Sequence, residues 1–98
     1  MKKTEENIKF LQQNPNAKCK WVKITKELKD MSEKWYKNAM HPNDKSTINY
    51  LKKIDAKKYA PIILHQYGNN IKIIDGWHRL YAAIHKDCNK IKAYLKVY

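Results

Sequence analysis

Two short apolar runs, at residues 61–67 and 71–75, define the most restrictive part of the sequence. The three residues between them, Gly-Asn-Asn at 68–70, tolerate the positive φ angles that a tight hairpin turn requires. Gly76 then separates the second run from residues 77–86, whose apolar side chains recur with helical spacing. This part of the chain therefore predicts a strand, a hairpin turn, a second strand and a helix in direct succession.

The remaining segments predict three further helices and two further strands. Apolar residues recur with helical spacing over 4–13, 25–39 and 46–57, and they alternate with lysines over 18–24 and 90–97. The element order is then α-β-α-α-β-β-α-β. This order is typical of an α+β (mixed α/β) domain.

Two of these helices carry expectations about individual residues. In the first helix, Ile8 and Leu11 share one face. Residues 41–44, His-Pro-Asn-Asp, are expected to break the chain, so that Ser46 or Thr47 caps the helix that follows.

The length and the cysteine content limit the domain organisation. The 98 residues allow one domain, and we expect residues 1–17 to form an N-terminal helical arm beside a domain at 18–98. No apolar run approaches the roughly 18 residues of a membrane span, and no signal peptide is recognisable, so we expect a cytoplasmic protein. Cys19 and Cys88 fit a reducing compartment and form neither a disulfide framework nor a zinc site.

The net charge of +12 favours negatively charged partners. The chain has 21 basic and 9 acidic residues, and the excess is larger over residues 45–98 than over 1–44. Three interpretations remain open: a lysine-rich surface without a specific partner, binding of DNA or RNA, and binding of an acidic protein.

Arg79 is the only arginine among the 21 basic residues. Together with His78 it falls in the first turn of the helix predicted at 77–86, where positive charges oppose the helix dipole. A phosphate bound at the helix N-terminus would remove this conflict, and Gly76 would let the backbone approach it closely. The alternative is structural: Arg79 pairs with Asp75, and His78 is a half-buried side chain with a partner of its own.

The motif residues resemble a known superfamily. Pro61-Ile62-Ile63-Leu64, a hairpin, and then Ile74-Asp75-Gly76-Trp77-His78-Arg79-Leu80-Tyr81-Ala82-Ala83 are similar to the "PI-x-V … DG-x-HR-xx-A" pattern of the ParB/sulfiredoxin superfamily. The similarity covers residues 44–98 well and 18–43 loosely, and residues 1–17 lie outside it.

The resemblance implies a nucleotide-binding domain of the ParB/sulfiredoxin-like fold. Members bind a nucleoside triphosphate, CTP in ParB proteins and ATP in sulfiredoxins, with its phosphates at the start of the motif helix. By position, Gly76, His78 and Arg79 would form the phosphate cradle. Asp75 would orient this cradle or help to hold a magnesium ion.

Departures from the family pattern narrow the choice of activity. Trp77 occupies the position of the reactive cysteine of sulfiredoxins, so sulfiredoxin chemistry is not expected. Because the sequence ends at Tyr98 without a downstream helix-turn-helix, we do not expect a full ParB clamp. Among the family members, the free-serine kinases resemble the motif most. Their catalytic His-Glu pair corresponds here to His41-Pro42, so the glutamate is missing. Asp44 could replace it as the general base, or His41 and Asp44 could form a helix-capping turn.

Trp77 itself has two interpretations. As an exposed ring beside a phosphate site it would stack on a nucleobase. As a core residue it would pack under the hairpin.

Two functions from different classes follow. The first is binding of a nucleotide or of nucleic-acid phosphate, with phosphoryl-transfer or nuclease/NTPase activity as its catalytic form. The small number of carboxylates near Asp75 argues against two-metal hydrolysis. The alternative is a non-enzymatic phage- or plasmid-encoded protein that binds and inhibits a host nucleic-acid-handling (defence) complex.

Overall fold

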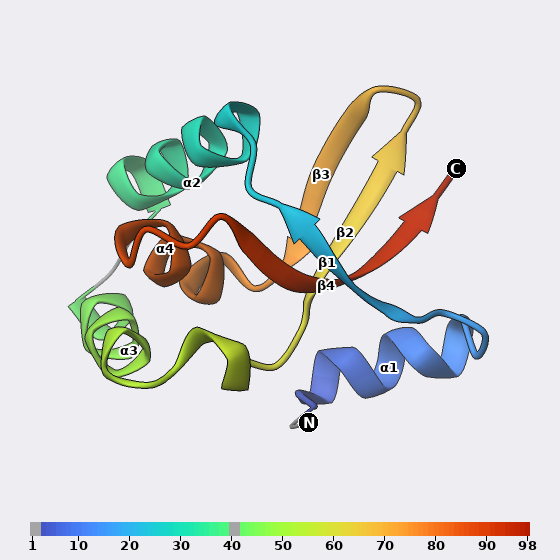
Figure 1. The fold of residues 1–98 in the computed structure, drawn as a ribbon, viewed down its shortest axis with the longest axis horizontal. Helices are drawn as coiled ribbons and strands as arrows, with labels where there is room; N and C mark the ends of the chain where they lie inside the picture. The colour runs from blue at the N-terminus through green and yellow to red at the C-terminus, as the bar shows by residue number, and fades with distance from the viewer. Residues whose placement is uncertain (1–2, 40–41) are drawn as a thin grey trace.

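The computed structural model describes residues 3–39 and 42–98 as one α+β arrangement (Figure 1). This part of the chain contains four α-helices, one short 3₁₀ helix and a four-stranded mixed sheet, and the α-β-α-α-β-β-α-β order is confirmed. The elements are α1 (Glu5–Gln13), β1 (Cys19–Lys23), α2 (Lys26–Ala39), α3 (Pro42–Lys53), η1 (Ala56–Lys58), β2 (Ile62–Tyr67), β3 (Asn70–Asp75), α4 (Trp77–His85) and β4 (Lys90–Val97).

The strands are arranged in the order β1-β4-β2-β3. The two central strands, β4 and β2, run parallel, and each edge strand pairs antiparallel with its neighbour. The expected hairpin joins β2 to β3 through a two-residue turn in which Gly68 has a φ of +60°. A positive φ at the first turn residue is the reason a glycine is needed there.

The main core lies between the sheet and helices α2 and α4. Figure 1 shows α2, α3 and α4 together on one side of the molecule, whereas α1 lies apart from them. Alternate residues of the central strands, Ile62 and Leu64 of β2 and Ile91 and Ala93 of β4, are buried in this core. The fully or nearly buried members of this core are Ile24, Leu28, Tyr59, Ile62, Leu64, Ile73, Leu80, Ala82, Ala83, Ile91 and Ala93.

Helix α1 packs on the other side of the sheet through Asn7 and Phe10, which are buried. Ile8 is 49% exposed, and Leu11 is partly buried against the same cluster as Phe10. The Asn7 side-chain nitrogen donates a 2.9 Å hydrogen bond to the carbonyl oxygen of Pro61, and the Phe10 ring packs against Tyr94. A buried amide with a specific partner therefore sets the rotation of this helix, which apolar spacing alone does not reveal.

Helix α3 begins earlier than the sequence suggested. It starts at Pro42 and ends at Lys53, so Ser46 and Thr47 lie inside the helix and do not cap it. The Thr47 hydroxyl donates instead to the carbonyl oxygen of Asn43, one turn earlier. A proline is compatible with the first helical turn because its missing N–H has no helical partner there.

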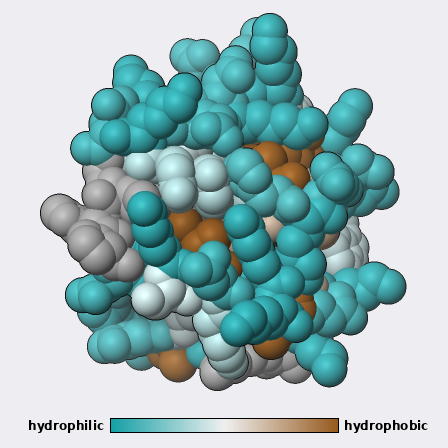
Figure 2. Space-filling model, turned by 90° about the vertical axis from the view of Figure 1, so that its left-hand side faces the viewer, coloured by the Kyte–Doolittle hydropathy of each residue, from teal (hydrophilic) through white to brown (hydrophobic). Residues whose placement is uncertain are grey.

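The exterior of the molecule is mostly polar. Figure 2 shows a hydrophilic surface with small separate apolar patches on the side where α2, α3 and α4 lie. None of the helices in the described part of the chain combines the length and the apolar composition of a membrane span. Both cysteines are free thiols.

Candidate phosphate-binding site

The turn between β3 and α4 is built around Gly76. Its φ of +105° lies in a region that residues with a Cβ rarely adopt. A Cβ at this position would lie 2.3 Å from Cγ2 of Ile62 and 2.7 Å from its Cβ. The glycine is therefore required by the close packing of the turn on β2, whatever the turn binds.

Gly76 is also the N-cap of α4, and it provides no side chain to cap the helix. The first N–H groups of any α-helix lack partners within the helix, so this end offers backbone donors and the positive end of the dipole. These are the general properties of an anion site. The side chains around the turn determine what such a site can hold.

Arg79 lies over this turn and pairs with Asp75. Its Nη2 donates a 2.9 Å hydrogen bond to Oδ2 of Asp75, and its side chain is only 13% exposed. Asp75 is the only hydrogen-bond partner of Arg79 among the described residues, and the buried Nε–H has none. The structural alternative for Arg79 is thus realised in the free protein, although most of its guanidinium donors remain unused.

His78 is held by Asp44, a residue of α3. The His78 Nε2 and Asp44 Oδ1 atoms lie 2.6 Å apart, which is the distance of a strong charge-assisted hydrogen bond. Both side chains are partly exposed. The structure therefore brings Asp44 to the motif helix, whereas His41, the other predicted catalytic residue, lies outside the described residues.

Trp77 packs on a second tryptophan from α2. Its ring is stacked on Trp35 with the two centroids 5.9 Å apart, and His78 meets Trp35 edge-on at 5.1 Å. Trp77 is half-buried and packs against the main core, so it is not a freely exposed ring. Together the two tryptophans support the start of α4 from the side of α2.

A small cavity lies beside Arg79, between the start of α1, α3 and η1. Its volume is about 170 Å³, and its lining combines the apolar residues Leu51, Ile54 and Ala60 with the polar or charged residues Thr4, Tyr50, Lys58, Tyr59 and Arg79. One arginine and one lysine therefore line the same hollow. Asp75 does not line it.

The arrangement does not favour a resident metal ion. Within residues 3–39 and 42–98, no group of three His, Cys, Asp or Glu side chains is placed to hold one. Asp75, the expected magnesium ligand, is engaged with Arg79. The site residues present thus fit an anion better than a cation.

Sequence reasoning missed Trp35, Lys58 and Thr4 as neighbours of the motif. Trp35 belongs to the apolar stripe of its helix, and that stripe predicts a core position with no hint of its partner in α4. Lys58 and Thr4 carry no local signal, because their approach to Arg79 depends on how η1 and α1 pack.

No protein-family model, curated protein or solved structure matches the chain. The resemblance to the ParB/sulfiredoxin superfamily therefore depends on the motif residues alone. The role of this site has to be argued from its own geometry.

Proposed function

We propose that this chain binds the phosphate groups of a nucleotide or of nucleic acid at the start of α4. Arg79 is the principal contact, and Gly76 and His78 complete the cradle. The proposal agrees with the resemblance of the motif to the nucleotide-binding ParB/sulfiredoxin superfamily, whose members use ATP or CTP.

The observation that carries the proposal is the incomplete hydrogen bonding of Arg79. A buried donor without a partner costs about 1–3 kcal/mol, so a ligand that supplies acceptors at this position is favoured. The guanidinium presents its donors in a planar fork that matches phosphate oxygens, whereas lysine offers only a point charge. In a chain whose other 20 cations are lysines, this geometry is specific to Arg79.

The size and the charge of the cavity support the Arg79 contact alone, because Gly76 and His78 do not line it. A volume of about 170 Å³ equals roughly five or six waters at the liquid volume of about 30 Å³ each. This space suits one phosphate group but not a whole nucleotide, so the sugar and the base would lie outside. Lys58 adds a second positive charge on the wall.

Thermal unfolding with ATP, CTP, GTP, UTP and inorganic phosphate tests the proposal. At a ligand concentration ten times Kd, binding adds about 1.4 kcal/mol, which raises Tm by roughly 6–11 °C in a domain of this size. Arg79→Lys keeps the charge but removes the fork, so the rise in Tm should disappear. Lys58→Ala should reduce it.

Lys53→Ala is the matched control, because this exposed lysine of α3 lies outside the cavity. It should leave the ligand-induced rise in Tm unchanged. If none of the four ribonucleotides raises Tm, or if Arg79→Lys retains the full rise, the phosphate site is refuted.

The Asp44–His78 pair favours a second candidate function, phosphoryl transfer. A carboxylate 2.6 Å from an imidazole holds the ring in one orientation, as in many general bases. His78 would then accept the proton of an attacking hydroxyl at Nδ1, while Arg79 stabilises the phosphate charge. Asp44 takes the orienting role here, not the role of the base itself.

Release of nucleoside diphosphate from ATP or CTP in the presence of small hydroxyl compounds tests this activity. His78→Gln retains a side chain that can hydrogen-bond but removes the base, so the rate at saturating nucleotide should fall by about 10²–10⁴-fold. Because His78 also belongs to the cradle, the rise in Tm is measured on the same variant to separate a loss of binding from a loss of catalysis. A rate equal to that of buffer for the wild-type protein would exclude the activity without affecting the binding proposal.

A further inference from the structure

A second basic surface lies at the other end of the sheet, on the face that α2 and α4 do not cover. We call it the aromatic–lysine cluster, and its members are His65 and Tyr67 of β2, Lys72 of β3, Lys96 of β4 and Tyr98 after it. The strand register places His65 directly between Lys72 and Lys96. The Tyr98 N–H donates to the Gln66 carbonyl oxygen, which holds Tyr98 beside β2.

The two tyrosines form an exposed stacked pair. The rings of Tyr67 and Tyr98 lie 4.4 Å apart between centroids and 9° from parallel, yet Tyr67 is 47% and Tyr98 56% exposed. His65 meets the Tyr98 ring at 5.1 Å, and the Lys96 Nζ lies 5.0 Å from the centre of that ring. Contacts within the cluster thus hold the two rings in place, and the rings remain exposed outside the core.

The charge around this pair is positive, and neither Lys72 nor Lys96 forms an ion pair with another of the described residues. Asp75 is the only carboxylate on the described strands, and it lies at the opposite end of β3. Burial and the ammonium groups of Lys96 and Lys72 lower the pKa of His65, as expected beside like charges. The cluster therefore complements a negatively charged partner.

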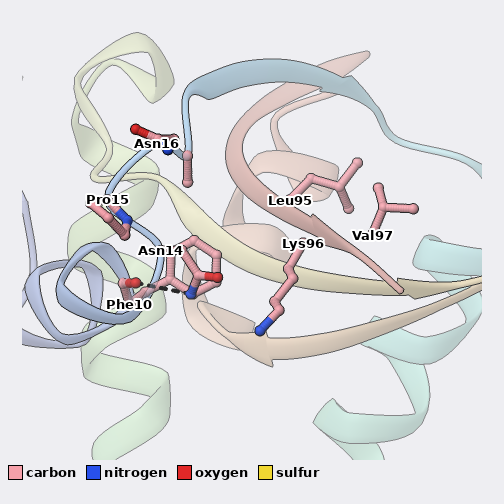
Figure 3. A pocket seen from close by; sticks show the side chains of 8 residues that line it. Phe10, Asn14, Pro15, Asn16, Leu95, Lys96 and Val97 are labelled. Carbon is pink, nitrogen blue, oxygen red and sulfur yellow. Dashed lines mark hydrogen bonds between the residues drawn. The ribbon is translucent and has the colours of Figure 1, made fainter.

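A larger pocket continues the cluster toward the end of α1. It holds about 400 Å³, and Lys96 belongs both to its wall and to the cluster. Figure 3 shows the Lys96 side chain extending from β4 near Phe10 and Asn14. The pocket forms where β1 stops pairing with β4, because the register between them ends at Tyr94.

We propose that the aromatic–lysine cluster binds single-stranded nucleic acid. Bases stack on Tyr67 and Tyr98, Lys72 and Lys96 contact the phosphates between them, and the adjoining pocket receives a neighbouring nucleotide. Exposed aromatic rings interleaved with cations are the general means of holding single strands, because every base has a flat face while the backbone repeats its charge. In a duplex these base faces are stacked on neighbouring bases, so we expect the cluster to bind single strands more tightly than duplexes.

This proposal does not depend on the phosphate site at α4, because none of its residues lines that cavity. An acidic protein would match the charge of the cluster. It would not require flat, exposed, mutually stacked rings. The charge and the rings together favour a polynucleotide.

Fluorescence anisotropy with labelled dT12, rU12 and a 12-base-pair duplex tests the proposal on the full chain. Tyr67→Ala and Tyr98→Ala should each weaken binding of the single strands by about fivefold to a hundredfold, the usual effect of losing one stacked base. Tyr67→Phe and Tyr98→Phe keep the rings and should bind nearly as well as wild type. Comparison of dT12 with rU12 distinguishes DNA from RNA.

The lysines are tested by the salt dependence of binding. Lys72→Ala with Lys96→Ala should reduce the slope of log K against log[salt] by about 1.4, since each phosphate contact on a single strand contributes about 0.7. The matched control is Lys52→Ala with Lys53→Ala on α3, which removes equal charge from another exposed surface. It should change affinity much less.

Three results would overturn the proposal. The first is equal binding by the alanine and phenylalanine variants of the tyrosines. The second is an equal loss in both double-lysine variants, which would indicate attraction to the overall charge. The third is a duplex affinity as high as that of the single strands. Arg79→Lys should leave binding of dT12 at the cluster intact. This variant therefore distinguishes a failure of the phosphate site at α4 from a failure of the aromatic–lysine cluster.

Discussion

Substitution of Gly76 by alanine gives the most direct test of how this fold holds its site. The alanine Cβ would lie 2.3 Å from Cγ2 of Ile62, a side chain that is fully buried in the main core and has no space to move. The φ of +105° adds a backbone cost that is independent of this contact. Both effects act on the folded state.

The two contributions can be estimated separately. A residue with a Cβ in a left-handed conformation costs about 1–2 kcal/mol, and overpacking of a closed core costs about 1–3 kcal/mol. Gly76→Ala should therefore lower the free energy of unfolding by about 2–5 kcal/mol. In urea, with a slope near 1–1.5 kcal/mol/M for a chain of this length, the midpoint should fall by about 1.3–5 M.

Gly68→Ala is the matched control for this measurement. Gly68 also has a positive φ, +60°, but a Cβ there would meet nothing within 4 Å. Only the backbone cost applies, so we expect a loss of about 1–2 kcal/mol. The difference between the two variants, followed by circular dichroism in urea, measures the contact with Ile62.

A double-mutant cycle with Ile62→Ala isolates the same contact. Truncation of Ile62 removes the Cγ2 atom, so the cost of Gly76→Ala should be smaller by about 1–2 kcal/mol in that background. If Gly76→Ala is no more destabilising than Gly68→Ala, or if the cycle shows no coupling, close packing of the turn on β2 is not the reason for the glycine.

Three further predictions concern individual polar groups. Asn7→Ala should lower the free energy of unfolding by about 1–3 kcal/mol, measured in urea, because it leaves the buried carbonyl of Pro61 without its donor. Burial raises the pKa of Tyr59 to about 12, so the unfolded chain releases this proton first and stability should fall between about pH 10 and 12; Tyr59→Phe should lose this alkaline decrease. Because the pKa of His65 is lowered in the free protein, phosphates that neutralise the two neighbouring lysines should raise it. Binding of dT12 should therefore tighten as pH falls from about 7 to 5.5, and His65→Gln should remove that dependence.

The secondary structure could be predicted well where local signals agree. The hairpin at Gly68, the turn at Gly76 and the last strand each combine a turn residue with a clear apolar period, and the structure confirms all three. The start of α3 was misplaced because Pro42 was interpreted as a break, although proline is equally compatible with a first helical turn.

The candidate site contains one contact within the motif and one contact between distant segments, and only the first could be predicted from the sequence. The Asp75–Arg79 pair spans four residues within the motif, so it could be foreseen as an alternative from the sequence. The contact of Asp44 with His78 spans 34 residues and depends on how α3 packs against α4. No single segment carries that information.

The aromatic–lysine cluster could not be predicted from the sequence, because it too depends on contacts between distant segments. Tyr98 has no adjacent aromatic residue in the sequence, and its partner Tyr67 is 31 positions away on β2, three elements before β4. Only the parallel pairing of β2 with β4 brings the two rings into a stack. Tyr94, in contrast, packs on Phe10 under α1, so tyrosine content alone does not identify the surface.

The two proposed sites differ in how the free protein neutralises their charge. Arg79 and His78 each have a carboxylate partner, so a phosphate at α4 has to compete with Asp75 for the guanidinium. Lys72 and Lys96 have no such partner among the described residues. Long-range attraction of a polyanion should therefore act mainly at the sheet face, whereas recognition at α4 depends on the geometry of one arginine.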